Sequence, residues 1–304
     1  MNKPYIAHFG VDYSIKKYLN GSIFPFHLSP KTFSKISNSK NIEAFSIKSQ
    51  SIIDKKILKN FPKLKMIVTR TIGKDHIDLK ACKLKKIKVC NVPNYGSSNI
   101  AEHAIALLLA GCRNVVQADK HVHKGKFSYN DFLGVGMKGK TVGVIGTGKI
   151  GLAFIKLAKA FDVNIIAFDV FKNEKAASES GFKYVALENL LTNSDFISIH
   201  VPLLPETKHM IGEKELKKMR NGIILVNTSR GAIIDTLALI KHIKKFKAVC
   251  LDVLEDELNF SKNHPLLKYD NVIITPHIAF YTDLSVIEIA RQTNIHIDNY
   301  FKGN

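Results

Sequence analysis

The sequence predicts an α/β protein with two domains, each built on a doubly wound parallel sheet. Short apolar runs that suit buried strands alternate with helix-forming stretches along most of the chain. A glycine-rich turn of the G-x-G-x-x-G type follows one of these runs near the middle of the sequence. The 304 residues also exceed the about 100–200 that one domain usually holds, so a second domain is expected.

The first hundred residues predict a small parallel α/β unit. Strands are expected at Tyr5–Phe9, Ile42–Ser46, Met66–Thr69 and Lys88–Asn91, and helices at Ser51–Asn60 and Ile77–Leu84. The glycine-bearing segment from Thr69 to Gly73 follows the third strand, at the edge where α/β sheets bind ligands. An ordinary strand-to-helix turn explains the same segment equally well.

The apolar run Val142–Ile145 and the glycines after it predict a nucleotide-binding turn. Gly146 suits the tight turn out of the strand, and Gly148 lets the backbone approach a pyrophosphate. Gly151 allows the following helix, expected over Leu152–Ala160, to pack on the sheet. The free N–H groups in the first turn of that helix then face the phosphates.

A second strand, Asn164–Phe168, ends at Asp169, eighteen positions after Gly151. An acid at about this distance binds the ribose hydroxyls of NAD and repels the extra phosphate of NADP. Strand, turn, helix, second strand and acid therefore occur in the order that dinucleotide binding requires, and the sequence predicts NAD as the cofactor.

The alternation of strands and helices continues to the end of the chain. Further strands are expected at Phe196–His200, Gly222–Asn227, Ala248–Leu251 and Val272–Thr275. Further helices are expected at Ile100–Arg113, Glu188–Thr192, Glu213–Met219, Asp235–Phe246 and Ser285–Phe301. Asn99 is the expected N-cap of the first of these helices, and the last is expected to return to the first domain. The domains are therefore placed at 1–99 plus about 280–304, and at 100–279.

The formal charge of +19 does not by itself indicate a nucleic-acid partner. Proteins that read nucleic acids favour arginine, whose planar group makes bidentate contacts. Of the 45 basic residues only five are arginines, the lysines are scattered, and no nucleic-acid-binding motif accompanies them. We therefore expect no nucleic acid as partner.

Cysteine usage and hydropathy indicate a cytoplasmic protein without a membrane partner. Cys82, Cys90, Cys112 and Cys250 show no C-x-x-C spacing and are interpreted as reduced thiols. The longest apolar stretch, from Ile100 to Cys112, is too short to span a bilayer. No signal peptide is visible. A metal site is not expected either, because no histidine has carboxylates around it at ligand spacing.

Three expected strands of the second domain end in residues that suit catalysis. Arg230 follows the strand that ends at Asn227, Asp252 closes the next strand, and His277 follows the last. The carboxyl ends of parallel strands face one crevice, so these residues can converge on one ligand. Further candidate acids lie just beyond Asp252, at Glu255, Asp256 and Glu257. Taken alone, Arg230 is explained more simply by a salt bridge, and His277 by a capped strand end.

This set of residues suits a 2-oxo acid as substrate. The planar guanidinium of arginine matches a carboxylate and can polarise the adjacent ketone. A protonated histidine can donate to the carbonyl oxygen while a nicotinamide supplies a hydride, and a carboxylate on the other ring nitrogen orients the imidazole.

The chain resembles the D-2-hydroxyacid dehydrogenase family, and within it the D-lactate dehydrogenase group. The motifs that carry the resemblance are VGVIGTGKIG, SDFISIHVPLLPETKHMI, LVNTSRGAIID, LDVLEDEL and NVIITPHIAFYT, with TRTIGKDHIDL and NVPNYGSSNIAEHA in the first domain. They cover most of residues 66–282. The resemblance implies two Rossmann-like or flavodoxin-like domains, with a cleft between them that closes over the reactants, and a homodimer.

The resemblance also implies a role for each matching position. The catalytic set is Arg230, His277 and the acid five residues beyond Asp252, which selects Glu257 over Glu255. The substrate-binding set is Ile72, Gly73, Tyr95, Arg230 and Phe280. The cofactor-binding set is Gly146, Gly148, Lys149, Ile150, Gly151, Asp169, Val201, Pro202, Thr207, Thr228, Ser229, Arg230 and Asp252.

The function implied is NAD-dependent interconversion of a small 2-oxo acid and its D-2-hydroxy acid, with pyruvate and D-lactate as the expected pair. Phe280 and Tyr281 after the histidine favour a small apolar substituent on the substrate. Two alternatives stay open. One is another substrate of the family, namely glyoxylate, hydroxypyruvate, a branched 2-oxo acid or 3-phosphoglycerate. The other is a non-catalytic, NAD-sensing protein like the co-repressors that share this fold.

Overall fold

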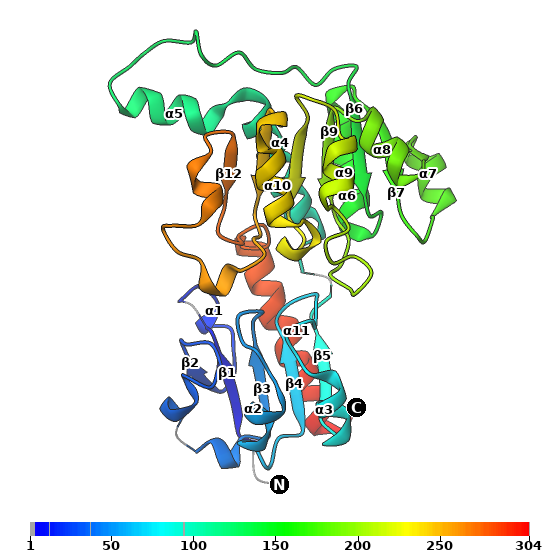
Figure 1. Cartoon of the computed structure of the whole chain (residues 1–304). Helices are drawn as coiled ribbons and strands as arrows, with labels where there is room; N and C mark the ends of the chain where they lie inside the picture. The colour runs from blue at the N-terminus through cyan, green and yellow to red at the C-terminus, as the bar shows by residue number, and fades with distance from the viewer. Residues whose placement is uncertain (1–3, 12, 37, 94, 304) are drawn as a thin grey trace. The chain divides into compact units, whose positions relative to one another are not determined.

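The computed structural model describes residues 4–11, 13–36, 38–93 and 95–303. The chain divides into two compact units (Figure 1). Unit 1 holds Met1–Gly96 and Tyr281–Asn304, and unit 2 holds Ser97–Phe280. The chain thus leaves unit 1 once, forms the whole of unit 2 and returns for its last helix. Both units have an all-parallel sheet in the described residues, as the sequence predicts.

Unit 1 is built on a five-stranded sheet with the strand order β2-β1-β3-β4-β5. Its strands are β1 (Ile6–Phe9), β2 (Ser22–Phe24), β3 (Ala44–Ile47), β4 (Met66–Thr69) and β5 (Lys88–Asn91). Its helices are α1 (Tyr13–Lys16), α2 (Lys55–Lys59), α3 (Leu79–Leu84) and α11 (Asp283–Lys302). β3 and β4 are buried along their whole length, and apart from Ser46 and Thr69 their residues are apolar.

Two helices of unit 1 begin later than predicted because aspartates cap them. The carboxylate of Asp54 accepts a hydrogen bond from Ile57 N at 2.8 Å, and α2 starts directly after this cap. Asp78 caps α3 in the same way. The residues before these caps, Ile53 and Ile77, pair with each other in an isolated parallel bridge. The predicted helices at 51–60 and 77–84 were therefore too long at their N-terminal ends.

Unit 2 is built on a seven-stranded sheet with the order β12-β11-β10-β9-β6-β7-β8. Its strands are β6 (Thr141–Ile145), β7 (Asn164–Phe168), β8 (Lys183–Tyr184), β9 (Phe196–Ile199), β10 (Ile224–Asn227), β11 (Ala248–Leu251) and β12 (Val272–Ile274). Its helices are α4 (Ser97–Arg113), α5 (Val115–His123), α6 (Lys149–Ala158), α7 (Glu174–Ser180), α8 (Leu187–Asn193), α9 (Glu213–Lys218) and α10 (Thr236–His242).

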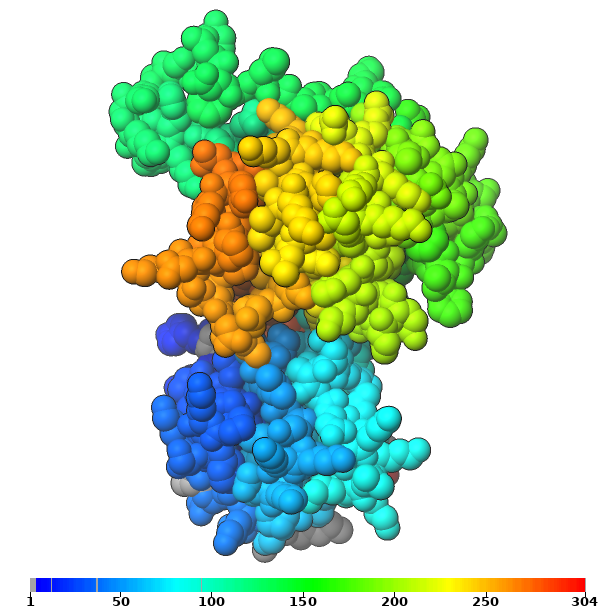
Figure 2. All heavy atoms as spheres, viewed as in Figure 1, coloured from blue at the N-terminus to red at the C-terminus, as the bar shows by residue number. Residues whose placement is uncertain are grey.

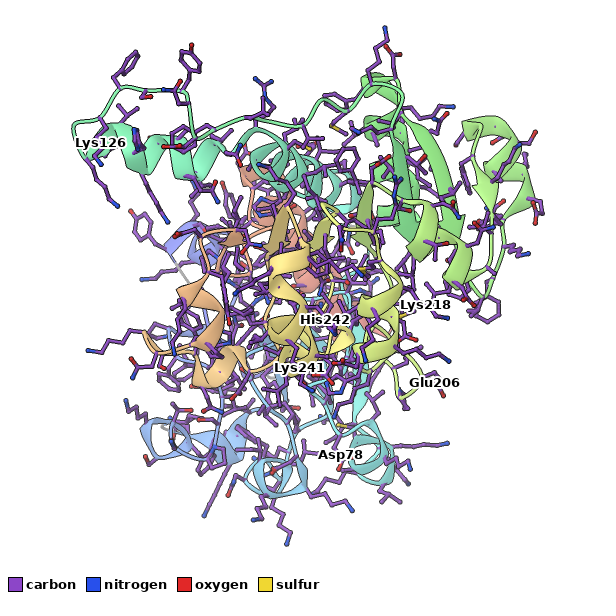
Figure 3. All side chains as sticks on the ribbon, turned by 45° about the horizontal axis from the view of Figure 1, so that its top comes forward. Asp78, Lys126, Glu206, Lys218, Lys241 and His242 are labelled. Carbon is purple, nitrogen blue, oxygen red and sulfur yellow. The ribbon has the colours of Figure 1, made fainter. Side chains whose placement is uncertain are left out.

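Helices cover both faces of the unit 2 sheet, so its central strands are buried on two sides. One apolar core packs α4 and α6 against the sheet, and a second core packs α8, α9 and α10 against the opposite face. Ion pairs link the three helices of that second layer: His242 and Lys241 lie 2.9 and 3.8 Å from Glu213, and Lys218 lies 2.9 Å from Glu188. Figure 3 labels the three basic members of these pairs. Exposed pairs of this kind contribute little stability, about 0–1 kcal/mol each.

The buried helix predicted at 100–113 starts earlier, at Ser97, so Asn99 lies inside α4 and the prediction that it caps the helix is wrong. After α4 comes Asn114, whose φ is +52°, and the chain then forms α5 and the loop that leads to Met137. We call residues 115–136 the arm. In Figures 1 and 2 the arm projects from the rest of unit 2, and Figure 3 labels Lys126 near its end.

No helix in the described part of the chain combines the length and the apolar character that a bilayer span requires.

Candidate active site

The glycine-rich turn has the shape that the pyrophosphate of NAD requires. A Cβ atom at Gly151 would lie 2.0 Å from the carbonyl oxygen of Gly146, and one at Gly146 would lie 2.8 Å from the backbone of His200. Gly146 also has a φ of +94°. Gly148 has open space where a side chain would stand, and α6 starts directly after it without a side-chain cap. Its first residues are Lys149 and Ile150, and the contacts with the phosphates that the resemblance implies for them stay a prediction.

Asp169 is held beside this turn at the end of β7. Its Oδ2 accepts hydrogen bonds from the N–H of Thr147 at 2.6 Å and from the Thr147 hydroxyl at 3.0 Å. Its Oδ1 accepts from Phe171 N at 3.0 Å. The carboxylate is half-buried, with its negative charge fixed next to the glycines. The arrangement fits the ribose of NAD, and no motif in the sequence predicts that Thr147 fixes this carboxylate.

The loop after β9 holds three predicted cofactor contacts, Val201, Pro202 and Thr207. The Thr207 hydroxyl donates to Pro202 O at 2.6 Å and accepts from Leu204 N at 2.7 Å. β9 pairs in register with β6, so this loop leaves the sheet beside the glycine-rich turn. The Thr207 side chain therefore holds the loop by hydrogen bonds to the backbone of other loop residues. The cofactor contact assigned to Thr207 stays a prediction.

Three neighbouring strand ends line up at one edge of the unit 2 sheet. Asn227 of β10 pairs with Leu251 of β11, and Leu251 pairs with Ile274 of β12. The residues that follow each strand are Thr228, Asp252 and Thr275, so the candidate catalytic loops leave the sheet side by side. This placement is what the sequence analysis expected of parallel strands.

His277 is paired with Glu257, which lies in the loop after β11. His277 Nδ1 and Glu257 Oε2 are 2.8 Å apart, and the other carboxylate oxygen accepts from Leu254 N at 3.1 Å. A carboxylate can only accept here, so Nδ1 carries the hydrogen and Nε2 is the ring atom left for a ligand. The side chains are 21% and 32% exposed, which leaves the pair accessible to a small molecule.

Glu255, only two residues away, has a different partner. Its Oε1 lies 2.5 Å from His209 Nε2, and its Oε2 accepts from Thr236 N at 3.3 Å. His209 has a φ of +53°, a left-handed conformation that sequence patterns do not predict. The structure therefore separates the two candidate acids: one bonds His277 and the other ties the loop after β9 to the start of α10.

Asp252 is almost fully buried, at 1% exposure, and holds the loop that carries His277. Its Oδ1 accepts from the Thr275 hydroxyl and from Ile278 N, and its Oδ2 accepts from Ala279 N. The backbone oxygen of Asp252 accepts from His277 N at 2.8 Å. Within the described residues these contacts assign Asp252 to the protein framework, whereas its expected contact with the cofactor stays a prediction.

The charge of Asp252 is maintained by its hydrogen bonds. Burial by itself would raise the pKa of this carboxyl, but donors from His103, Thr275, Ala279 and Ile278 outweigh burial and lower the pKa below its ordinary value. His103, which lies in α4, reaches this carboxylate from a part of the chain distant in sequence. Its ring lies 3.0 Å from the Thr275 hydroxyl and 3.4 Å from the Asp252 carboxylate.

Arg230 sits in a tight loop after β10. Its NH1 group donates to Ser229 O at 2.8 Å, and Asn227 Nδ2 donates to Arg230 O at 2.9 Å. A Cβ atom at Gly231 would lie 1.9 Å from the carbonyl carbon of Leu254, so only glycine fits at that position. The Arg230 loop is therefore pressed against the segment that leads to Glu257.

The expected substrate-binding residues are divided between the two units. Ile72 and Gly73 follow β4 in unit 1, where Tyr95 is 8% exposed and accepts a hydrogen bond from Ser285 through its carbonyl. Phe280 belongs to unit 2, and its ring meets the ring of His277 edge-on at 6.3 Å between centroids.

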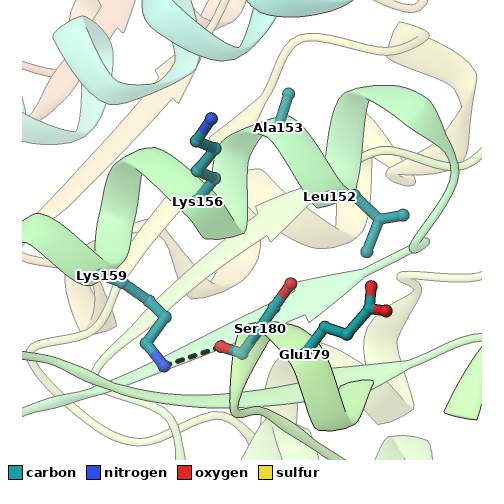
Figure 4. A pocket seen from close by; sticks show the side chains of 6 residues that line it. All are labelled: Leu152, Ala153, Lys156, Lys159, Glu179 and Ser180. Atoms are coloured by element: carbon teal, nitrogen blue, oxygen red, sulfur yellow. Dashed lines mark hydrogen bonds between the residues drawn. The ribbon is translucent and has the colours of Figure 1, made fainter. Parts of the chain in front are cut away.

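A separate hollow lies between α6 and α7 of unit 2 (Figure 4). Its volume is about 560 Å³. The Nζ of Lys159 donates to Ser180 O at 2.7 Å across one end of the hollow. None of the predicted site residues lines it, so we do not assign it to the candidate active site.

Comparison with known proteins identifies the family. Residues 105–279 match the model for the NAD-binding domain of D-isomer specific 2-hydroxyacid dehydrogenases. The chain is 45% identical over 239 residues to a glyoxylate reductase of Thermococcus litoralis, with 76% of this chain and 72% of that protein covered. It is 40% identical over 263 residues to a D-3-phosphoglycerate dehydrogenase of Archaeoglobus fulgidus, with 86% of this chain covered but only 50% of that protein.

Solved structures share both units of the fold. The apo D-lactate dehydrogenase of Escherichia coli superposes with a TM-score of 0.88 at 34% identity, with 99% of this chain and 98% of that chain covered. The D-lactate dehydrogenase of Aquifex aeolicus, solved with NAD and lactic acid, gives 0.87 at 35% identity over 98% and 96% of the chains. The chain belongs to the D-isomer specific 2-hydroxyacid dehydrogenase family, and residues 105–279 are its NAD-binding domain.

Proposed function

We propose that this protein is an NAD-dependent oxidoreductase that interconverts a small 2-oxo acid and its D-2-hydroxy acid, with pyruvate and D-lactate as the preferred pair. The observation that carries the proposal is the pairing of His277 with Glu257 at 2.8 Å, beside the strand ends that carry Asp252 and Arg230. An accessible histidine oriented by a carboxylate is the arrangement that general acid–base catalysis requires.

In the direction of reduction, NADH would supply, when bound, the hydride that the carbonyl carbon of the 2-oxo acid accepts. Arg230 binds the substrate carboxylate and polarises the ketone. His277 donates the proton on Nε2 to the carbonyl oxygen, which becomes the hydroxyl group. Glu257 holds Nδ1–H and stabilises the imidazolium form that donates. In the reverse direction His277 accepts the hydroxyl proton.

The cofactor is assigned to the edge of the unit 2 sheet where the glycine-rich turn lies. We propose that the turn and the first residues of α6 bind the pyrophosphate and that Asp169 binds the ribose hydroxyls. The remaining contacts are proposed at Val201, Pro202, Thr207, Thr228, Ser229, Arg230 and Asp252. Because a carboxylate repels a phosphate, Asp169 favours NAD over NADP.

The substrate is proposed to meet the backbone N–H groups of Ile72 and Gly73 through its carboxylate, with Tyr95 and Phe280 contacting the rest of the molecule. Phe280 supports a small apolar substituent such as the methyl group of pyruvate, because its ring stands next to the ring of His277. Similarity to the solved D-lactate dehydrogenases over nearly the whole chain supports the same pair.

A second candidate substrate is glyoxylate, which is favoured by the 45% identity to a protein named glyoxylate reductase. A panel of 2-oxo acids distinguishes the two: pyruvate, glyoxylate, hydroxypyruvate, a branched 2-oxo acid and the 2-oxo form of 3-phosphoglycerate, each assayed with NADH. The proposal expects the highest kcat/KM with pyruvate. A higher value with glyoxylate would replace pyruvate and leave the reaction class standing, whereas no turnover of any acid would contradict the dehydrogenase assignment.

We also propose that the protein works as a homodimer joined through the arm, and that it resides in the cytoplasm. Several large apolar side chains of the arm are exposed to solvent, with exposures that reach 96% at Phe127. Apolar groups gathered on a projecting segment indicate a protein partner, and a second copy of the chain is the simplest one. The four cysteines are free thiols, which supports a reducing compartment.

A further inference from the structure

The loop after β4 has three consecutive carbonyl groups that are each held by a hydrogen bond. Val92 N donates to Thr71 O at 3.2 Å, and Asn91 Nδ2 donates to Ile72 O at 2.7 Å. The hydroxyl of Thr71 donates to Gly73 O at 2.7 Å. A loop with this many fixed peptide groups is more ordered than an ordinary turn between a strand and a helix.

Fixing the carbonyls also fixes the N–H groups. In a trans peptide the N–H points opposite to the C=O of the same plane. Holding Thr71 O therefore orients the N–H of Ile72, and holding Ile72 O orients the N–H of Gly73. Among the residues that the structure describes, neither N–H donates a hydrogen bond. Two adjacent, oriented donors remain for a ligand that can accept them, and a carboxylate is such a ligand.

The Thr71 hydroxyl, which donates to Gly73 O, also accepts a hydrogen bond and is the end of a chain of such bonds. Thr71 uses its hydrogen on Gly73 O, so it accepts from the hydroxyl of Thr69 at 2.6 Å. Thr69 then accepts from His76 Nε2 at 2.9 Å. The direction of every bond is thereby assigned, from His76 through the buried Thr69 to Thr71.

We propose that Thr71 and Asn91 are positioning residues for the substrate carboxylate, and that Thr69 and His76 support Thr71. The inference rests on the proposed function, which assigns the N–H groups of Ile72 and Gly73 to that carboxylate. Thr71 and Asn91 act through the backbone and do not touch the substrate. Donors that are oriented before binding bind an anion more tightly than donors that must reorient.

The test compares Thr71→Val, which keeps the shape but removes the hydroxyl, with Thr71→Ser, which restores it. Thr71→Val is expected to raise KM for the preferred 2-oxo acid about tenfold and to weaken inhibition by oxamate by the same factor, while kcat stays within about threefold. Thr71→Ser is expected to keep the parent values. Asn91→Ala is expected to act like Thr71→Val. The Kd for NADH, measured by fluorescence titration, should not change, because the cofactor site belongs to unit 2.

If Thr71→Val and Asn91→Ala both keep the KM and the oxamate inhibition of the parent protein, the inference is overturned and the dehydrogenase function stays intact. Equal losses in Thr71→Val and Thr71→Ser would also overturn it, because the hydroxyl would then be irrelevant. Thermal melts establish that each variant is folded, and if Thr71→Val does not fold, Asn91→Ala decides the question. A parent protein that reduces no 2-oxo acid would instead contradict the proposed function.

Discussion

Two glutamates in the loop after β11 differ in partner, and we propose that they differ in function for that reason. Glu257 bonds the ring of His277, and Glu255 bonds His209. Both side chains are partly exposed, both accept from a backbone N–H, and they lie two positions apart. The pair forms a matched comparison, because the same substitution at the two positions changes only which histidine loses its carboxylate.

We expect Glu257→Gln to lower kcat for 2-oxo acid reduction by a factor of about 10², since the amide no longer stabilises the imidazolium form of His277. His277→Ala should lower it by about 10²–10⁴, because the proton donor is gone. Glu255→Gln is the control and should retain at least a third of the parent kcat. Steady-state assays with NADH measure all three. If Glu255→Gln lowered kcat as much as Glu257→Gln does, the assignment of Glu257 as the catalytic acid would be contradicted.

Asp169 provides a test of cofactor choice. Asp169→Asn keeps an acceptor for the N–H of Thr147 but removes the negative charge. The ratio of kcat/KM for NADH over NADPH should fall about tenfold or more, because the repulsion of the extra phosphate is lost. An unchanged ratio would show that another residue selects the cofactor. A thermal melt of the variant checks that the glycine-rich turn is intact.

At the scale of residues, the sequence predicts which side chains follow the strand ends at one edge of the unit 2 sheet. It does not predict the hydrogen bonds that each of them forms. Arg230, Asp252 and His277 follow strands that their apolar runs reveal, so their common edge is predictable. The burial of Asp252 is not, because it depends on donors from a loop and from α4 that are distant in the sequence. The left-handed backbone of His209 is likewise set by tertiary contacts.

At the scale of elements, a buried polar chain ties three strands of unit 1 together. His8 of β1 donates from Nε2 to Asn20 O at 3.1 Å, so Nδ1 accepts from Ser46 of β3 at 2.7 Å. Arg70, which follows β4, donates to Ser46 and to Phe9 O at the end of β1. Burial, and to a lesser extent the nearby Arg70 charge, lowers the pKa of His8 to about 4.

This pKa predicts acid sensitivity of unit 1. Between pH 6.5 and about 4 the unfolded chain binds a proton at His8 that the folded chain does not, so the free energy of unfolding falls as the pH is lowered. The slope from one such histidine is at most about 1.4 kcal/mol per pH unit. Denaturant unfolding at several pH values should show that the free energy of unfolding changes less steeply with pH in His8→Gln than in the parent. His123→Gln, at an exposed site, is the control and should keep the slope of the parent. Equal slopes in parent and His8→Gln would contradict the burial argument.

Periodicity predicts elements well where they are apolar and poorly where they are short or polar. The strands on either side of the glycine-rich turn, β6 and β7, lie where the sequence placed them. The sequence does not predict the strands β2 and β8, which hold three and two residues, or the four-residue helix α1. It also does not predict α5 and α7, because α5 has no buried residue and α7 buries only Ala177.

At the scale of the whole molecule, the arm predicts the oligomeric state. Phe127 and Leu133 are 96% and 85% exposed, and their burial against a second copy would favour a dimer. Sedimentation equilibrium should show a dimer for the parent and a shift to monomer for Phe127→Ser combined with Leu133→Ser. Tyr13→Ser, at a 95% exposed site in unit 1, is the matched control and should stay dimeric. A monomeric parent would rule out the homodimer.

The fold alone does not select the substrate. Proteins named glyoxylate reductase, D-3-phosphoglycerate dehydrogenase and D-lactate dehydrogenase all resemble this chain at 34–45% identity. One framework therefore serves several 2-oxo acids, and the choice depends on the few side chains that meet the substituent. The substrate panel measures that choice directly.

The split of unit 1 along the chain has a consequence for biosynthesis. Strands β1 to β5 are synthesised before unit 2, yet helix α11, which buries Val286, Ile289 and Ala290 within the same unit, is synthesised only after unit 2. Throughout the synthesis of unit 2 the nascent sheet lacks this cover and exposes apolar surface. Unit 1 is thus complete only after α11 has been synthesised, and molecular chaperones have that whole interval in which to bind the nascent sheet.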